Sequence, residues 1–274
     1  MRICVIGGAN ADIIATSFGA FVPNDSNPGG VGRNIAHNLA ILGDEVVFLT
    51  QFGGDAFGRF TADSCREAGM DISLCDYAPK GVRSCFLSIN DCNGEMVGGV
   101  ADMVAAEGIT AEWLAAKLSK VGDVDVYVAD ANITVEALAY LIDHADKPLY
   151  LDAVSGAKAP KIREAVSLSN KKHFFSLKCN QLENVCLEDL ETVDRRFVSL
   201  GANGLDICEG KTKHHFEALP CRVVNATGAG DALMAGIIHA GPEATVEEAA
   251  RIGLLCAKNN IESPDTVNQQ KVRW

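Results

Sequence analysis

The stretch VVNATGAGDALMAG, residues 223–236, says more about the fold of this chain than any other. It passes from two valines through a glycine turn into an apolar helix. Gly228, Ala229 and Gly230 lie where the first helical amides have no partner within the helix, so these N–H groups and the helix dipole suit an anionic phosphoryl group. Asp231 follows at once, and a carboxylate beside a bound phosphate could take the proton from an attacking hydroxyl.

The same pattern has a plainer interpretation. Glycines also allow a tight helix start, and an aspartate in the first turn interacts favourably with the helix dipole without any ligand. A short Gly-x-Gly-Asp motif is a weak signal by itself. The rest of the chain therefore has to support or contradict a phosphate site.

Composition and charge exclude several classes of protein. The chain has 274 residues, with 36 Asp and Glu against 24 Lys and Arg and a net charge of -12, which argues against a general nucleic-acid binder. No run approaches the ~18 apolar residues of a membrane helix. The N-terminal apolar run ends at Gly7-Gly8, too early for a signal peptide. The ten cysteines lack zinc spacing, and we expect them to be reduced in a cytoplasmic protein.

Short apolar runs alternate with helical patterns along the chain. This alternation predicts an α/β fold with a largely parallel sheet that is covered on both faces. The predicted strands are 3–6, 46–49, 124–128, 149–151, 173–177 and 197–200. The predicted helices are 34–42, 59–68, 111–120, 135–145, 161–166, 228–239 and 245–259, the last beginning with a Thr245-x-x-Glu248 capping box.

Two segments interrupt this alternation. Residues 16–28 are rich in Gly, Pro, Asn, Asp and Ser, and 84–100 reads as strand, Asn93-Gly94 turn and strand. Together they could form a small sheet that closes over the carboxyl edge of the main sheet as a lid. A mere surface excursion explains the pattern equally well. We expect a single domain over 1–274, with lid segments at about 15–29 and 83–100.

Several motifs together resemble those of the ribokinase-like (PfkB) carbohydrate and nucleoside kinases. Residues 227–231 resemble the C-terminal signature of that family, and 29–36, followed by Gly43, resemble the N-terminal signature. The resemblance covers nearly the whole chain. The shorter motifs in the family's order are Asn10-Ala11-Asp12, Gly53-Gly54-Asp55 with Gly58, Asn180-x-x-Glu183 and 199–204. Within the family the chain looks most like the pseudouridine kinases, on residues 27–28, 128–133, 152–155 and 225–231.

The resemblance implies a fold and an activity. The fold would be a ribokinase-like three-layer α/β/α sandwich with a small β lid. The activity would be ATP-dependent phosphorylation of the 5′-hydroxyl of a nucleoside, with pseudouridine as the leading substrate and Mg²⁺ as the metal. Ribose, adenosine or another sugar of the family, or a non-catalytic nucleoside-binding role, are the alternatives. We expect a small-molecule partner, no nucleic acid, no membrane, and possible pairing of two copies through the lid.

The resemblance also assigns an acceptor site. Asn10, Asp12, Gly29, Gly30 and Asn34 would hold the sugar, although Asn10 and Asp12 are also common turn residues. Asn132 would join them, or would instead be the N-cap of the following helix. Arg33 is either a solvated side chain or a contact to a charged or carbonyl-bearing ligand, and the sequence does not separate these.

A nucleotide site is implied on the other side of the glycine turn. Its residues would be Asn180, Glu183, Ser199, Gly201, Gly204 and Thr227, with Mg²⁺ held through water near Glu183. From spacing alone, Asn180-x-x-Glu183 fits a helix N-terminus better than a metal site. Asp231 would be the catalytic base, with the amides at Gly228, Ala229 and Gly230 stabilising the transferred charge.

Two departures from the family pattern bear on this site. Only fifteen residues separate Glu183 from Ser199, so we expect a trimmed and more open nucleotide side. Asn225 stands where many relatives have an aspartate that binds a monovalent cation, and the missing charge weakens a K⁺ site.

Overall fold

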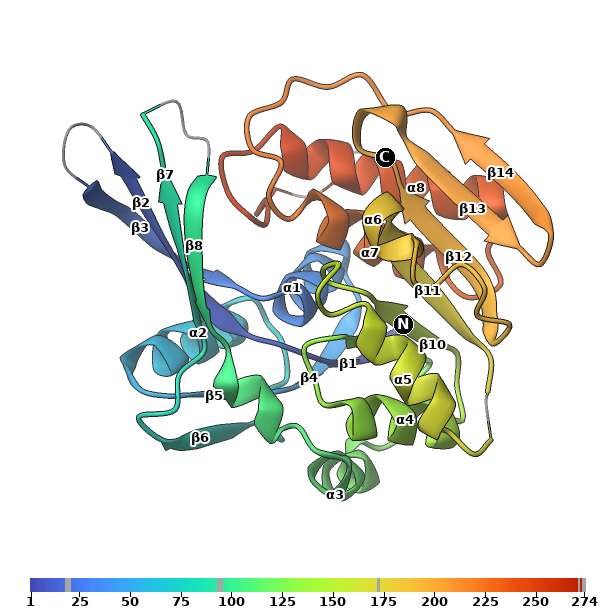
Figure 1. The fold of residues 1–274 in the computed structure, drawn as a ribbon, viewed down its shortest axis with the longest axis horizontal. Helices are drawn as coiled ribbons and strands as arrows, with labels where there is room; N and C mark the ends of the chain where they lie inside the picture. Colours follow the sequence, from blue (N-terminus) through green and yellow to red (C-terminus); the bar gives the residue numbers. More distant parts are fainter. Residues whose placement is uncertain (18–20, 93–95, 172, 271, 273–274) are drawn as a thin grey trace.

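An eight-stranded sheet forms the centre of the computed structural model, which describes residues 1–17, 21–92, 96–171, 173–270 and 272 (Figure 1). Its strand order is β14-β13-β12-β11-β10-β9-β1-β4. The strands are β1 Arg2–Ile6, β4 Glu45–Leu49, β9 Val126–Asp130, β10 Leu149–Asp152, β11 Phe175–Asn180, β12 Val193–Ser199, β13 Leu205–Glu209 and β14 Thr212–Phe216. The six predicted strands all pair in parallel, as expected. The antiparallel β13 and β14 were missed by the apolar pattern.

Side chains of the central strand β1 alternate between two hydrophobic cores. Ile3 and Val5 pack in one core, and Cys4 and Ile6 pack in the other. A strand that is apolar on both faces needs helices on both sides of the sheet. The first core is covered by α1 Val31–Leu42, α2 Ala56–Glu67, α7 Ala229–Ala240 and α8 Val246–Ile261, and the second by α3 Ala111–Val121, α4 Val135–His144 and α5 Pro160–Leu168.

A small four-stranded sheet stands apart from this body, in the order β3-β2-β7-β8 (Figure 1). Its strands are β2 Asn10–Ser17, β3 Phe21–Gly29, β7 Cys85–Asn90 and β8 Met96–Asp102. The predicted hairpin of 84–100 is confirmed as an antiparallel pair, although its Asn93-Gly94 turn lies outside the described residues. The segment 16–28 is not irregular as expected, because most of it pairs with β2 and places Asn10 opposite Gly29.

Short elements complete the chain. A two-stranded sheet consists of β5 Gln51–Gly54 and β6 Asp76–Lys80, and the short helices are η1 Val104–Gly108, α6 Gln181–Asn184 and η2 Gly201–Asn203. Between α6 and β12 the described chain has only turns, as the short spacing predicted. Among the described residues, no helix is both long and apolar enough to cross a membrane.

Helix starts test two predictions directly. The Thr245 side chain accepts a hydrogen bond from the Glu248 amide and caps α8, as predicted. The N-cap of α4 is Thr134 and not Asn132, because the Thr134 hydroxyl accepts from the Ala137 amide. Asn132 is therefore free for another role.

The buried carboxylate of Asp130 joins three segments at the carboxyl edge of the sheet. It accepts the amides of Gly8 at 3.1 Å and Gly32 at 2.7 Å. It also accepts the backbone amide of Asn132 at 2.9 Å and its side-chain amide at 2.7 Å. A Cβ on Gly7 would lie 2.8 Å from this carboxylate, so the turn after β1 needs glycine. The carboxylate thus holds that turn against the start of α1.

We predict that Asp130→Asn lowers the free energy of unfolding by about 2–4 kcal/mol, because an amide NH₂ would face N–H donors that remain buried. Urea denaturation measures the change. The control is Asp71→Asn, an exposed side chain that accepts one amide in its own turn and should shift stability by less than about 0.5 kcal/mol. Equal stabilities for Asp130→Asn and the wild type would contradict the role of this carboxylate.

Candidate active site

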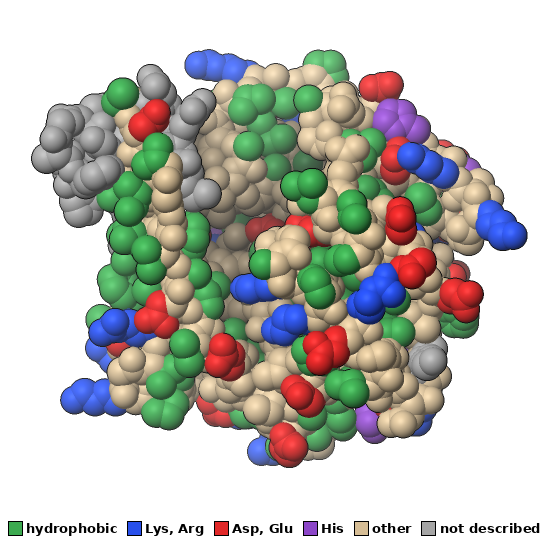
Figure 2. Space-filling view, viewed as in Figure 1, with side chains coloured by type: hydrophobic (Ala, Val, Ile, Leu, Met, Phe, Trp, Pro, Cys, Tyr) green, Lys and Arg blue, Asp and Glu red, His purple; other side chains and the backbone are tan. Residues whose placement is uncertain are grey.

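The surface is hollowed between the small sheet and the body, with acidic side chains at the bottom of the hollow and basic ones on its edge (Figure 2). The predicted acceptor residues Asn10 and Asp12 come together at the start of β2 in the small sheet. The Asn10 side-chain amide donates to the Asp12 carboxylate at 2.5 Å. Burial raises the pKa of Asp12 to about 6, against that hydrogen bond and the positive charge of Arg33.

Gly29 and Gly30, which are also predicted acceptor residues, lie against this pair. A Cβ on Gly29 would come within 2.0 Å of the Asp12 carboxylate. Gly30 has φ +100°, and a Cβ there would lie 2.5 Å from the Gly8 carbonyl oxygen and 2.9 Å from Asn10 Oδ1. Both positions therefore need glycine for the backbone to pass so near the two polar side chains.

Asn34 connects the acceptor residues to Asp231. Its side-chain amide donates to Asp231 Oδ2 at 2.8 Å, and both residues are buried although 197 positions separate them in the chain. Burial raises the pKa of Asp231 to about 7, and the negative charge of Asp152 adds to this rise, while Lys178 and the Asn34 hydrogen bond oppose it. The predicted base is thus a carboxylate poised to change protonation near neutral pH.

Lys178, at the carboxyl end of β11, is the cation among these acids. Its Nζ lies 3.0 Å from Asp152 Oδ2. A Cβ on Gly230 would be 3.0 Å from the same Nζ, which puts the ammonium at the start of α7. Burial would lower the pKa of Lys178, but the charges of Asp152, Asp231 and Glu183 outweigh burial and raise it. The ammonium group stays protonated where a transferred phosphoryl group would need a positive charge.

The turn that follows Asp152 is strained. Val154 has φ +65°, which a β-branched residue rarely adopts. The Ser155 amide donates to the Ala153 carbonyl at 2.7 Å across it, and the Val154 amide donates to Asp152 Oδ1 at 2.7 Å. Strain of this kind persists where the surrounding structure holds it, and it is concentrated at functional sites.

The amides at the start of α7, which the sequence predicts to bind an anion, differ from that prediction at one residue. The amide of Ala229 donates to the Ala226 carbonyl at 3.3 Å, so it is not free as expected. Within the described part of the chain, no backbone hydrogen bond uses the amides of Gly230 or Asp231. Gly228 is the left-handed N-cap at φ +79° and packs against Thr266, whose carbonyl oxygen would lie 2.0 Å from an added Cβ.

A cavity of about 540 Å³ lies on the other side of this helix start. The predicted residues Ser199, Gly201 and Gly204 line it, and so do Ala229 and Gly230. Thr227 does not line it, and its carbonyl accepts from Asn260 instead. The apolar part of the wall comes from Ala202, Ala218, Leu219, Pro220, Cys221, Val223, Ala226, Leu233, Leu254, Ala257 and Ile261. An apolar slot that ends at free helix amides suits the flat base and the phosphates of a nucleotide.

Asn180 and Glu183 form a reciprocal capping box at α6, the alternative that spacing alone favoured. Glu183 accepts from the Asn180 backbone at 2.8 Å and from its side chain at 2.7 Å, while Asn180 Oδ1 accepts from the Glu183 amide at 2.9 Å. Among the described residues no group of three His, Cys, Asp or Glu side chains is arranged to hold a metal. Both Glu183 oxygens are engaged by Asn180, so this carboxylate could help to hold a hydrated Mg²⁺ only through water.

Asn132 lies at the edge of the acceptor site as half of a polar pair. Its amide NH₂ donates to Asp130, and its oxygen accepts from the Lys158 ammonium. A Cβ on Gly8 would lie 2.8 Å from Asn132 Nδ2, so the pair sits directly beneath the turn that leads to Asn10. Lys158 is only partly buried, which leaves its positive charge available to a ligand.

Asn225 bridges the loop before α7 to the segment after α8. Its side-chain NH₂ donates to the Pro264 carbonyl at 2.9 Å, and its oxygen accepts the Thr227 amide at 2.9 Å. A cation site would need oxygen ligands here, and an N–H group directed at a carbonyl already makes the connection. The Asn225 side chain thus links the loop to the segment after α8 by hydrogen bonds.

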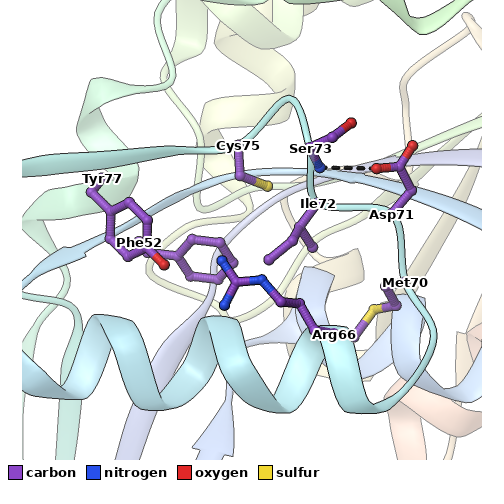
Figure 3. Close-up of a pocket in the computed structure, with 8 residues that line it drawn as sticks. All are labelled: Phe52, Arg66, Met70, Asp71, Ile72, Ser73, Cys75 and Tyr77. Atoms are coloured by element: carbon purple, nitrogen blue, oxygen red, sulfur yellow. Dashed lines mark hydrogen bonds between the residues drawn. The ribbon is translucent and has the colours of Figure 1, made fainter.

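A second pocket, of about 440 Å³, lies apart from these residues beside α2 and β6 (Figure 3). The side chains of Phe52, Arg66 and Ile72 point toward one another in it, whereas the Asp71 carboxylate turns away and accepts the Ser73 amide. None of the predicted site residues lines this pocket. It is not the candidate active site.

Sequence reasoning missed Lys178 and Lys158 and left Arg33 undecided. The predicted strand 173–177 stopped where the apolar run stops, but β11 continues to Asn180 and carries Lys178 at its buried end. Arg33 is buried and not solvated, with 3% of its surface exposed. A lysine or arginine next to a motif glycine or at the end of an apolar run is the signal that could have found them.

Comparison with known protein families shows to which family the chain belongs. Residues 1–272 match the family model for the pfkB family carbohydrate kinases, and the chain belongs to this family. It is therefore a phosphotransferase whose acceptor is an alcohol.

Two relatives of known name and one solved structure are similar to this chain over most of its length. Pseudouridine kinase of Escherichia coli K12 is 33% identical over 256 residues, which cover 86% of this chain and 82% of that protein. Guanosine-inosine kinase of Exiguobacterium acetylicum is 25% identical over 289 residues, or 96% and 95%. The structure of a ribokinase from Thermotoga maritima superposes with a TM-score of 0.77 at 19% identity, over 100% of this chain and 96% of that one. The predicted ribokinase-like α/β/α sandwich with a small β lid is confirmed.

We predict that Asp231→Asn stabilises the protein at pH 8 by about 1–3 kcal/mol, because each pKa unit is worth about 1.4 kcal/mol. The folded-state pKa of Asp231, about 7, lies above its usual 3.8, so the folded protein loses stability as the pH rises through this range. The gain should shrink toward pH 4, where wild-type Asp231 is largely protonated in the folded protein. Urea denaturation at both pH values measures it, with the exposed Asp63→Asn as control. A loss of stability at pH 8 would contradict this charge balance.

Proposed function

We propose that this protein is an ATP-dependent kinase that phosphorylates the 5′-hydroxyl of a nucleoside, with pseudouridine as its preferred substrate. The observation that carries the proposal is the buried pair of Asn34 and Asp231, joined at 2.8 Å beside the free amides of α7. Asn10 and Asp12, whose side chains suit the hydroxyl groups of a ribose, lie on one side of this pair. The apolar cavity lies on the other side. An acceptor and a donor nucleotide can therefore meet at Asp231.

The proposed reaction is an in-line displacement at the γ-phosphorus. The 5′-oxygen forms a bond to phosphorus as the bond from phosphorus to the β,γ-bridging oxygen breaks, and the hydroxyl proton passes to the Asp231 carboxylate. The amides of Gly230 and Asp231 and the Lys178 ammonium lie where they can stabilise the charge on the transferred group. Mg²⁺, held through water near Glu183 and Asp152, would neutralise phosphate charge.

Two observations favour a base that carries carbonyl groups. Lys158 and Asn132 place an ammonium group beside the acceptor site, and an ammonium only donates hydrogen bonds. A uracil ring offers carbonyl oxygens to such a group, whereas adenine has ring nitrogens but no carbonyl oxygen to accept from it. The 33% identity to a pseudouridine kinase points the same way. Guanosine and inosine also carry a carbonyl and are the second candidates.

The small sheet completes the proposal. It covers the hollow as a lid that excludes water from the transferred phosphoryl group. Its edge strand β8 exposes Val97 and Val100, which are 64% and 58% accessible, so two copies could pair there. Sedimentation measures such pairing.

The ten free cysteines agree with the cytoplasmic location that we propose.

Replacement of Asp231 by Asn should lower kcat by about 10²–10⁴-fold, the usual contribution of a general base, with little change in nucleoside affinity. In the wild type, kcat/KM should rise with pH and level off above about 7, because only the ionised carboxylate accepts a proton. A coupled ADP assay measures both quantities. Near-normal turnover of Asp231→Asn would remove Asp231 from this role.

A substrate panel separates the nucleosides. We expect kcat/KM for pseudouridine to exceed that for adenosine or ribose by at least about 10-fold, with no requirement for K⁺. Lys158→Met should remove most of the difference between pseudouridine and adenosine, while the exposed Lys211→Met should leave it intact. A wild-type preference for adenosine would overturn the proposed substrate, and nucleoside binding without ADP release would favour a non-catalytic protein.

A further inference from the structure

Arg33 is a buried arginine at the start of α1 with no carboxylate in hydrogen-bond contact among the described residues. One terminal nitrogen, Nη1, donates to the Pro28 carbonyl at 3.1 Å, and the other, Nη2, donates to the Ser64 hydroxyl at 2.8 Å. Its Nε is buried without a partner. A buried guanidinium is expensive to desolvate, so a function is expected for one that lacks a paired carboxylate.

The same Nη1 donates to the side-chain oxygen of Asn34 at 3.2 Å. The other end of that amide, Nδ2, donates to Asp231 at 2.8 Å. The Asn34 amide thus lies between a cation and a carboxylate. The reversed amide would direct N–H groups at the guanidinium and an oxygen at the carboxylate, which is unfavourable at both ends.

Two acceptor-site carboxylates share the charge of Arg33. The guanidinium favours the ionised form of Asp12, and it also attracts the carboxylate of Asp231. The other charged groups that face Asp231 are Lys178 of β11, Asp152 of β10 and Asp130 of β9. Of these only Lys178 is positive, and Asp152 lies 3.0 Å from it. Arg33 is therefore the second positive charge that acts on the base.

We propose that Arg33 is a positioning residue for phosphoryl transfer, which fixes the Asn34 amide in the orientation that hydrogen-bonds Asp231 and so keeps Asp231 an ionised, correctly directed base. Through the Pro28 carbonyl it also ties the end of lid strand β3 to the same amide. This inference rests on the proposed function, because it needs Asp231 to act as the base. It assigns no contact between Arg33 and the substrate.

The test is the pH dependence of kcat/KM for pseudouridine in Arg33→Met, Arg33→Lys and wild type. Arg33→Met should move the midpoint of the rise to higher pH, because both the lost charge and a freed amide favour protonated Asp231. Its activity should fall by about 10–100-fold near pH 6 and recover substantially near pH 9, mainly through kcat and not KM. Arg33→Lys should keep a midpoint close to wild type, since it restores the charge, but a lower kcat, since one ammonium cannot replace the forked contacts.

Two further variants keep the result interpretable. Ser64→Ala removes one Arg33 contact without touching Asn34 and should shift the midpoint in the same direction by a smaller amount, which tests the inference if Arg33→Met does not fold. Arg66→Met, an exposed arginine on α2, should change nothing. An unchanged midpoint with activity reduced equally at every pH in Arg33→Met, or an unshifted midpoint in Ser64→Ala should Arg33→Met not fold, would overturn the inference. Retained turnover in Asp231→Asn would instead overturn the proposed base.

Discussion

The carboxylate of Asp130 is the constraint on which the site geometry depends. By binding the turn after β1 and the start of α1 together, it fixes where Asn10 and Asn34 emerge from the backbone. Asp231 can meet Asn34 only because α1 begins at that point. Burial raises the pKa of this carboxylate, and four N–H donors that would be unsatisfied without it oppose that rise.

Around this anchor the protein keeps charges that a more stable fold would avoid. Asp152, Asp231 and Glu183 are buried near a single ammonium, and the pKa of Asp231 is raised to about 7. The strained Val154 adjoins the same cluster. Buried charges and backbone strain of this kind lower the stability of a protein. They are typical of catalytic sites, which need groups that can change their protonation state. Lys178 limits the cost for all three carboxylates, and Arg33 limits it for Asp231.

Most of the fold could be predicted from the apolar pattern, and the errors at the carboxyl ends of the strands have one physical cause. The predicted strands ended at Val128, Leu151 and Leu177, but β9, β10 and β11 run on to Asp130, Asp152 and Asn180. An apolar run ends at the first charged residue. In this protein, however, the charged residues Asp130, Asp152 and Lys178 near the strand ends are also buried in the sheet. The pattern was therefore least accurate at the strand ends that build the site. The apolar pattern also missed β13 and β14. At the sheet edge, β14 is mostly polar, with exposed and half-buried residues, so it has no apolar run.

By itself the sequence determined the order of layers, the glycine turn before α7 and the candidate base, because hydrophobic periodicity and helix-start chemistry are local properties. The tertiary structure alone decided which partners each polar residue has. It showed that Asn180 and Glu183 form a capping box at α6, that Asn132 pairs with Lys158, that the Ala229 amide is already used, and that Arg33 is buried. Hydrogen-bond partners and burial depend on residues that lie up to 197 positions away in the chain, as for Asn34 and Asp231, and no local pattern records that distance.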